Sequence, residues 1–253
     1  MRVFLTGATS GIGEALAHHY AAAGATLGLF ARRAAELERV AAALHPATVV
    51  TYAGDVRDAQ ALATAGADFC ERFGAPDIVI ANAGVSRGTL TEVPADLPAF
   101  QIVFDTNVMG MVNTFAPFVA TMRRERRGIL AGVASIAGFR GLPGAAAYSA
   151  SKAAAVSCLE SLRVELLGSG VAVVTLCPGF VATPLTARNP YRMPFILQPA
   201  RAAHLMAGAI ARRQRFYTLP WQVAWLGRLL RVLPRPLYDR VLAGRKRKPR
   251  DDD

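Results

Sequence analysis

The sequence is poor in cysteine, with only Cys70, Cys158 and Cys177 among its 253 residues. Their spacing fits neither a disulfide framework nor a metal motif, so we expect buried thiols in a reducing compartment and no metal site. Charged residues are also scarce, at 19% against 53% hydrophobic residues, which excludes an intrinsically disordered chain. This composition predicts one globular domain with a substantial hydrophobic core.

Long apolar runs are missing as well. No stretch approaches the roughly 20 apolar residues that a helix needs to span a bilayer. Met1-Arg2 leads directly into the apolar run Val3-Phe4-Leu5, which leaves no room for a signal peptide in front of it. The expected location is cytoplasmic.

Short apolar runs alternate with longer segments of helical spacing along most of the chain. The expected strands are Val3–Thr6, Thr26–Ala31, Thr48–Tyr52, Ile78–Ala81, Gly128–Ala134, Val171–Cys177 and Arg215–Leu219. The expected helices begin near Ile12, Ala34, Asp58, Phe100, Ala146 and Ala200. This alternation predicts a three-layered, doubly wound α/β fold of the Rossmann type, with seven parallel strands.

Glycine marks the first strand-to-helix connection. Gly7, Gly11 and Gly13 form a Gly-x-x-x-Gly-x-Gly turn between the strand Val3–Thr6 and the helix that begins near Ile12. Glycine lets the backbone turn sharply and approach a pyrophosphate closely, and the helix N-terminus favours that negative charge. This context predicts a dinucleotide site rather than a plain tight turn.

A second functional pattern lies between Ser135 and Lys152. Ser135 follows the apolar run Gly128–Ala134, and Tyr148 precedes Lys152 by four residues in a segment of helical spacing. Side chains at this spacing share one helix face. The Lys152 ammonium would lower the pKa of the Tyr148 phenol from about 10 toward neutrality, and Ser135 would donate a hydrogen bond to a carbonyl oxygen. The pattern predicts a proton donor, its activator and a carbonyl-orienting hydroxyl.

Together these motifs resemble the short-chain dehydrogenase/reductase family from Arg2 to about Leu219. The matching elements are, in order, Thr6-Gly7-Ala8-Thr9-Ser10-Gly11-Ile12-Gly13, Asp55, Asn82-Ala83-Gly84, Asn107, Ser135, Tyr148, Lys152 and Pro178-Gly179 with Thr183. The resemblance implies a catalytic set of Asn107, Ser135, Tyr148 and Lys152. With Arg32 and Arg33, which are included for their charge, the residues expected to contact the cofactor are Gly7, Thr9, Ser10, Gly11, Ile12, Gly13, Arg32, Arg33, Asp55, Val56, Asn82, Ala83, Gly84, Tyr148, Lys152, Pro178, Gly179, Val181 and Thr183.

The same resemblance implies individual roles. Asp55 would meet the adenine ring, Asn107 would hold a water that links Lys152 to solvent, and Thr183 would help to hold the nicotinamide carboxamide. The residues themselves leave two alternatives open. Asp55 also suits the N-cap of the helix that begins near Asp58, and Asn107 also suits a helix-kinking amide in the core.

No acidic residue ends the second expected strand, where NAD-binding sites usually place one about 20 residues after the glycine turn. Ala31-Arg32-Arg33 stands there, and the first acid is Glu36. Guanidinium groups suit the 2′-phosphate of NADP. We therefore expect NADP rather than NAD, with Arg32 as the main contact and Arg33 or Ser10 assisting. The alternative is that both arginines are solvated residues at a helix start.

Residues 184–199 match the variable substrate loop of the resembling family. Charge in this loop is limited to Arg188 and Arg192, and its apolar residues are Leu185, Tyr191, Met193, Phe195, Ile196 and Leu197. A lid of this composition suits an apolar substrate. The alternative is a loop whose apolar side chains pack on the body of the protein.

The net charge of +11 is concentrated near the C-terminus, because residues 201–253 carry +9 and residues 1–200 carry +2. The extension 220–253 combines a polar strip at Gly227, Arg228 and Arg231 with the apolar residues Trp221, Trp225, Leu226, Leu229, Leu230, Val232 and Leu233, and Arg245-Lys246-Arg247-Lys248 follows. Such a pattern suits a helix packed on the body or on a second subunit, or one lying on an anionic membrane surface through residues 221–248. Nucleic acid is disfavoured, since the basic run is short and lacks a recognition module.

The sequence thus predicts an NADP-dependent oxidoreductase that transfers a hydride between nicotinamide and a ketone or secondary alcohol. The expected substrate is lipophilic: a steroid-like, long-chain or 3-oxoacyl compound. Residues 1–219 would be the catalytic domain and residues 220–253 its basic extension, and the resemblance implies a homodimer or homotetramer. The alternative is a non-catalytic dinucleotide-binding regulatory protein on the same fold, which the intact Ser135, Tyr148 and Lys152 disfavour.

Overall fold

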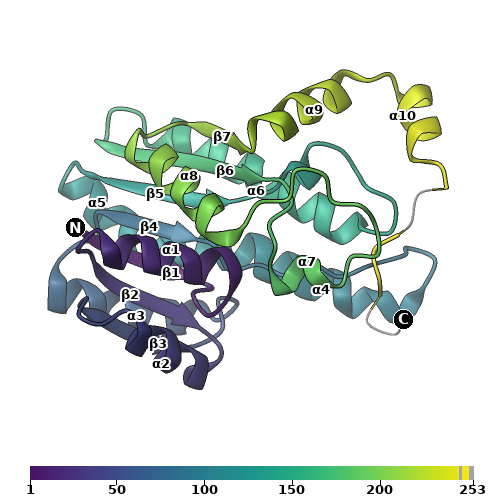
Figure 1. The fold of residues 1–253 in the computed structure, drawn as a ribbon. Helices are drawn as coiled ribbons and strands as arrows, with labels where there is room; N and C mark the ends of the chain where they lie inside the picture. The colour runs from purple at the N-terminus through teal and green to yellow at the C-terminus, as the bar shows by residue number, and fades with distance from the viewer. Residues whose placement is uncertain (245–246, 251–253) are drawn as a thin grey trace.

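The computed structural model describes residues 1–244 and 247–250 (Figure 1). Seven parallel strands form one sheet in the order β3-β2-β1-β4-β5-β6-β7. Their bounds are β1 Arg2–Thr6, β2 Thr26–Ala31, β3 Val49–Ala53, β4 Ile78–Ala81, β5 Gly128–Val133, β6 Val171–Pro178 and β7 Phe216–Leu219. The predicted doubly wound sheet is confirmed, and each strand end lies within one residue of its expected place.

Helices cover both faces of this sheet (Figure 1). Their bounds are α1 Gly11–Ala22, α2 Ala34–Ala43, α3 Ala59–Phe73, α4 Leu97–Phe104, α5 Gly110–Arg124, α6 Ala146–Glu165, α7 Pro184–Ala187, α8 Pro199–Ala211, α9 Trp221–Val232 and α10 Arg235–Leu242. Buried side chains of α1, α2 and α8 form the core on one face of the sheet, and those of α3, α5 and α6 form the core on the other. This arrangement gives the three layers that the sequence predicts.

The alternation of side chains along β1 divides the core between the two faces. Val3 and Leu5 belong to the cluster under α1 and α8, whereas Phe4 between them belongs to the opposite cluster. The ring centre of Phe4 lies 4.8 Å from that of Phe118 and 5.7 Å from that of Phe69. Since neighbouring residues of a strand point to opposite faces, one apolar run fills both cores.

The order of the strands reverses direction at β1, which has β2 on one side and β4 on the other. In a doubly wound sheet such a reversal leaves a crevice beyond the carboxyl ends of the strands, because the loops there diverge. The loops that follow β1, β2, β3 and β4 meet at this edge, so it is the place to look for a ligand site.

The C-terminal extension forms α9 and α10, which leave the body beyond β7 (Figure 1). It is tied to the loop before α6: Arg140 donates hydrogen bonds to the carbonyl oxygens of Leu230 and Leu233, at 2.9 and 3.0 Å, and the Tyr238 hydroxyl donates to the carbonyl of Gly141. The extension therefore packs on the body at these points. Across residues 1–244 and 247–250, none of the helices combines the length and the apolar character that crossing a bilayer requires.

Candidate active site

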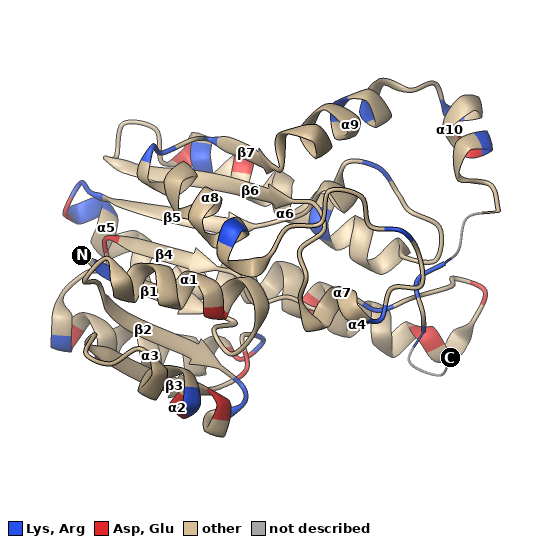
Figure 2. Ribbon diagram, viewed as in Figure 1, with Lys and Arg blue, Asp and Glu red and all other residues tan. Residues whose placement is uncertain are grey.

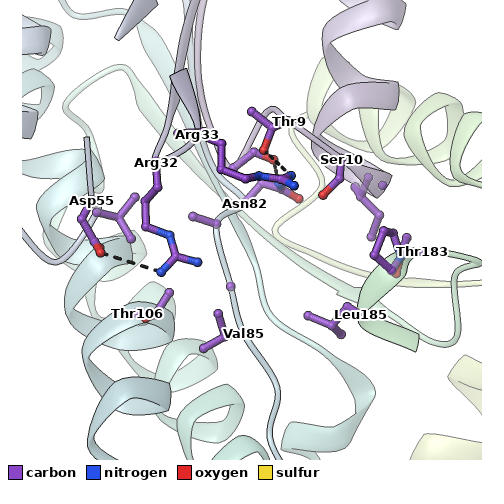
Figure 3. A pocket seen from close by; sticks show the side chains of 18 of the residues that line it. Thr9, Ser10, Arg32, Arg33, Asp55, Asn82, Val85, Thr106, Thr183 and Leu185 are labelled. Atoms are coloured by element: carbon purple, nitrogen blue, oxygen red, sulfur yellow. Dashed lines mark hydrogen bonds and ion pairs between the residues drawn. The ribbon is translucent and has the colours of Figure 1, made fainter. Parts of the chain in front are cut away.

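A pocket lies at the switch point, beyond the carboxyl ends of β1 to β4 (Figure 3). Its lining comes from the connections after β1, β2, β3 and β4, from the turn between α4 and α5, and from the segment after β6 with the start of α7. It consists of Gly7, Thr9, Ser10, Gly11, Ile12, Ala31, Arg32, Arg33, Gly54, Asp55, Val56, Asn82, Ala83, Gly84, Val85, Thr106, Thr183, Pro184 and Leu185. Most of the residues expected to hold a cofactor are thus brought together. Gly13, Tyr148, Lys152, Pro178, Gly179 and Val181 do not line this pocket.

The glycine turn after β1 has no room for larger residues. Gly7 and Gly11 adopt φ angles of +70° and +58°, in the left-handed region that favours glycine. A Cβ added to Gly13 would clash with the carbonyl oxygen of Gly7. The side-chain amide of Asn82 donates to the carbonyls of Thr6 and Gly7, at 3.2 and 3.1 Å, and so fixes the turn from β4. The turn leads into the N-terminus of α1, whose free backbone N–H groups favour an anion.

Two arginines follow β2 at the rim of the pocket, as the sequence predicts (Figure 3). Arg33 is already engaged, since its guanidinium donates to the Thr9 hydroxyl at 3.0 Å. Arg32 is freer: its side chain is 61% exposed, and its ion pair with Asp55 is long, at 3.9 Å. Asp55 pairs more closely with Arg57, at 2.7 Å, and the hydrogen bond from Arg57 is the main reason that the pKa of Asp55 is lowered.

The alternative role of Asp55 as a helix N-cap is wrong. Asp58 caps α3, because its carboxylate accepts hydrogen bonds from the backbone N–H groups of Gln60 and Ala61, at 2.9 and 3.0 Å. Asp55 lies one turn earlier, in the loop after β3, where it lines the pocket. Its carboxylate therefore faces the pocket, where it pairs with Arg57 and Arg32.

Ser135, Tyr148 and Lys152 come together at the end of β5. Ser135 caps a short 3₁₀ turn, Ile136–Gly138, and its hydroxyl accepts from the backbone N–H of Ala137 at 3.1 Å. The same side chain lies close enough to the Tyr148 phenol to lower its pKa. The Lys152 ammonium lies 5.9 Å from the centre of the Tyr148 ring and donates to the carbonyl of Val133 at 2.8 Å.

The electrostatics of this group differ from the expected lowering of the tyrosine pKa. Burial raises the pKa of Tyr148 above its ordinary value, and the nearby Ser135 hydroxyl opposes that rise. Burial also lowers the pKa of Lys152 to about 8. Lys152 is close to the ring but donates to the Val133 carbonyl, and the pKa of Tyr148 is raised rather than lowered.

Asn107 lies in a π-helical turn, Asp105–Met109, between α4 and α5. It is only 2% exposed and makes three hydrogen bonds: its Oδ1 accepts from Val85 N at 2.8 Å, and its Nδ2 donates to Val85 O at 2.9 Å and to the Ser151 hydroxyl at 3.0 Å. A Cβ added to Gly84 would lie 3.2 Å from Asn107 Oδ1 and 3.5 Å from Lys152 Nζ. Asn107 therefore fits the alternative of a buried core amide. It and Lys152 both lie beside Gly84.

The turn after β6 brings Thr183 back to the glycine turn. Gly179 donates to the carbonyl of Leu219 at 2.7 Å, and Val181 forms a single bridge with Leu197. Thr183 then caps α7, and a Cβ added to Gly11 would lie 2.8 Å from the Thr183 methyl group. This contact closes the pocket from the side opposite Arg32 (Figure 3).

The structure adds two residues that sequence reasoning missed. Ser151 accepts the bond from Asn107, although it directly precedes Lys152 and no spacing rule singles it out. Lys248, from the C-terminal extension, places its ammonium 5.7 Å from the centre of the Tyr148 ring. No local signal predicts that contact, because it joins residues 100 positions apart. Within residues 1–244 and 247–250, no group of three or more His, Cys, Asp or Glu is arranged to hold a metal ion.

Comparisons with known proteins agree with this geometry. A family model described as short chain dehydrogenase matches residues 1–192. An uncharacterized oxidoreductase of Myxococcus xanthus is 40% identical over 237 residues, which cover 93% of each chain. Among solved structures, a short chain dehydrogenase/reductase from Burkholderia phymatum in complex with NAD superposes with a TM-score of 0.83 at 27% identity, over 99% of this chain and 96% of that one. An alcohol dehydrogenase from Thermococcus sibiricus complexed with 5-hydroxy-NADP gives a TM-score of 0.77 at 27% identity, over 86% and 95% of the two chains.

Proposed function

Because the chain belongs to the short-chain dehydrogenase/reductase family, we propose that it transfers a hydride between NADP and a lipophilic ketone or secondary alcohol. The single observation that carries this proposal is the meeting of Ser135, Tyr148 and Lys152 at the end of β5, beside the dinucleotide pocket. A phenol, an ammonium and a hydroxyl at one place are the groups that carbonyl reduction needs.

The pocket fits a nicotinamide dinucleotide. The glycine turn, the N-terminus of α1 and the amide of Asn82 form a cradle for a pyrophosphate. The cradle keeps this shape only with glycine, because a Cβ at Gly7 would clash with the Ala83 backbone and one at Gly13 with the Gly7 carbonyl. Asp55 and Val56 would hold the adenine end, and Thr183 with the turn Pro178–Val181 would hold the nicotinamide end. When bound, the cofactor supplies or accepts the hydride.

In the reductive direction Tyr148 is the proton donor. Its raised pKa keeps the phenol protonated at neutral pH, which is the form that can protonate a carbonyl oxygen. Ser135 donates a hydrogen bond to the same oxygen and so orients it. Lys152, buried beside Tyr148, stabilises the phenolate that remains after proton transfer, and Asn107 supports the return of a proton toward Lys152.

Preference for NADP rests on Arg32. The residue follows β2 at the pocket rim, its guanidinium is exposed, and its existing ion pair with Asp55 is long and readily exchanged for a phosphate. Titration of the protein with NADPH and with NADH tests this preference. Comparable affinities for the two would overturn it.

A lipophilic substrate is supported by the lid, residues 184–199. Leu185, Phe195 and Ile196 are exposed, so these apolar side chains are not used in packing the lid onto the body. Exposed apolar side chains beside an active site suit an apolar ligand, because its binding removes them from water. We assign residues 1–219 to the catalytic domain and residues 220–253 to its extension.

The extension is proposed to contact an anionic membrane surface. Trp221 and Trp225 are 69% and 65% exposed, and Leu226, Leu229 and Val232 on α9 are exposed as well. Arginines accompany them on α9 and α10, with Asp239 as the one acid of these two helices (Figure 2). Apolar aromatics beside cations suit the interface of an anionic bilayer. Flotation with phosphatidylserine vesicles tests this contact, and a variant with Trp221→Ser and Trp225→Ser should stay in the aqueous fraction.

Self-association is proposed through α4, α5 and α6. Leu97 on α4, Met109 in the π-helical turn and Val112 on α5 are exposed, and exposed apolar residues suit an interface between subunits. Sedimentation velocity should show a dimer or tetramer, which Val112→Glu would dissociate. A monomer at micromolar concentration would contradict the proposal.

The central experiment is oxidation of NADPH in the presence of a panel of apolar ketones, with Tyr148→Phe as the paired variant. We expect turnover by the wild type and a loss of about 1,000-fold or more in kcat for the variant, since a phenyl ring has no proton to give. Equal rates in the two proteins would remove Tyr148 from catalysis.

A further inference from the structure

The last described residues, Arg247–Arg250, lie against two loops of the active site, and we call this segment the strap. The backbone N–H of Gly88 donates to the carbonyl of Pro249 at 3.0 Å. A Cβ added to Gly88 would lie 2.5 Å from the carbonyl oxygen of Lys248, and one added to Gly144 would lie 2.7 Å from the Cβ of Arg247. The strap therefore fits closely between the loop after β4 and the loop before α6.

An ion pair anchors the end of the strap. The Arg250 guanidinium donates from Nε to both carboxylate oxygens of Asp96, at 3.0 and 3.1 Å. Asp96 is only 5% exposed, and it also accepts from the backbone N–H of Leu90 at 2.7 Å. A buried carboxylate with a defined cation is a specific attachment point, because leaving it unpaired is costly. Figure 1 shows the strap beside α4, although the two segments are far apart in the sequence.

This anchoring places Lys248 at the proposed proton donor. Its ammonium lies 5.7 Å from the centre of the Tyr148 ring, and Lys152 lies at a similar distance of 5.9 Å. Within residues 1–244 and 247–250, no carboxylate forms an ion pair with Lys248. Burial, and the positive charge of Arg188 in the lid, lower the pKa of Lys248 to about 8, which leaves it mainly protonated at neutral pH. A partly buried ammonium beside a second cation is best compensated by an anion.

We propose that the strap forms one wall of the substrate site and that Lys248 binds an anionic group of the substrate, such as a carboxylate. The inference rests on the proposed function and narrows its substrate class to carbonyl compounds that combine an apolar chain with an anionic group. The lid supplies the apolar contacts, and Lys248 with Arg188 supplies the positive charge. Lys248 is thus a specificity-determining residue that the C-terminal extension, and not the catalytic domain, contributes to the substrate site.

Binding of decanoate and of methyl decanoate to the NADPH-loaded protein tests this inference without turnover. We expect the wild type to bind the carboxylate about 10- to 100-fold more tightly than the ester, and Lys248→Met to lose that preference. Arg240→Met is the matched control, because it removes an equal charge from the same C-terminal extension at an exposed residue of α10, outside the strap. The control should keep the preference. Equal affinity of the wild type for acid and ester, absent binding of both, or an unchanged preference in Lys248→Met would overturn the inference.

Arg250 acts as a positioning residue, and its role has a separate readout. Arg250→Gln and Asp96→Asn should each reduce the preference for the acid, and the double variant should reduce it no further, since both break the same anchor. Arg250→Lys should keep more of the preference for the acid than Arg250→Gln does, because the lysine can still pair with Asp96. Additive losses in the double variant would mean that the strap is not held by this pair. Loss of turnover in Tyr148→Phe concerns the proposed function, whereas these binding ratios concern Lys248, so either can fail alone.

Discussion

The side-chain amide of Asn107, in a π-helical turn, donates to the hydroxyl of Ser151 at 3.0 Å. The same amide also bonds to the backbone N–H and to the carbonyl oxygen of Val85. The pair ties the wide turn between α4 and α5 to α6, the helix that carries Tyr148 and Lys152. One buried amide thus joins the loop after β4 to the proposed catalytic helix.

Replacing Asn107 with alanine should lower the free energy of unfolding by about 2–4 kcal/mol, because Val85 N–H and C=O lose their partners in a buried place. Turnover should fall as well, because Asn107 no longer holds the loop at Gly84 in place beside Lys152. Urea unfolding and steady-state kinetics measure the two effects. Gln101→Ala is the control: its amide bonds to Asp105 in an exposed place, and its loss should change stability by less than about 0.5 kcal/mol. A stable Asn107→Ala protein would show that its bonds are replaced by water.

Arg32→Ala should change the choice of cofactor. We expect the dissociation constant for NADPH to rise about 10- to 100-fold while that for NADH changes by less than about twofold, since only the 2′-phosphate needs the guanidinium. Isothermal titration with each nucleotide provides the comparison. Arg39→Ala removes the same charge from α2, where Arg39 pairs with Glu14 and Glu36 and does not line the pocket. If Arg32→Ala weakened both nucleotides equally, the residue would bind a phosphate shared by both.

Buried Lys152 should make stability depend on pH. Its pKa is about 8 in the folded protein and 10.5 in the unfolded chain, so between these values the unfolded chain holds the extra proton and stability rises with pH. The slope for one group is at most about 1.4 kcal/mol per pH unit. Lys152→Met removes this term while Lys248 and the tyrosines stay in place. The free energy of unfolding of the wild type minus that of the variant should therefore increase between pH 8 and 9.5. A constant difference would mean that Lys152 titrates normally in the folded state.

The fold was predictable because its signals are local. Along β1, Val3, Phe4 and Leu5 are all apolar, as a strand buried on both faces requires, and the same holds for the other central strands. The glycine turn needs no tertiary information either, since the φ angles of Gly7 and Gly11 are inherent to it. These features fixed the strand ends to within one residue.

The site was predictable only where neighbours in the sequence are neighbours in space. The spacing of Tyr148 and Lys152 gives their proximity, but the sign of the tyrosine pKa shift depends on burial, which the rest of the fold decides. Asp55 and Asp58 lie three residues apart before the same helix, and only the structure shows that Asp58 is its N-cap. The approach of Lys248 to Tyr148 depends on the whole course of α9 and α10, so no spacing rule reaches it.

The glycine turn offers the sharpest steric prediction. Gly13→Ala should abolish nucleotide binding and lower the free energy of unfolding by about 1–3 kcal/mol or more, because the new methyl group meets the Gly7 carbonyl and the Asn82 amide and the turn has to open. Gly141→Ala is the matched control: nothing lies within 4 Å of its Cβ position, and its φ is not in the left-handed region. Nucleotide titration and urea unfolding of both variants decide the matter. Normal binding by Gly13→Ala would mean that the turn tolerates a side chain, and the cradle that we assign to the pyrophosphate would then have to lie elsewhere in the pocket.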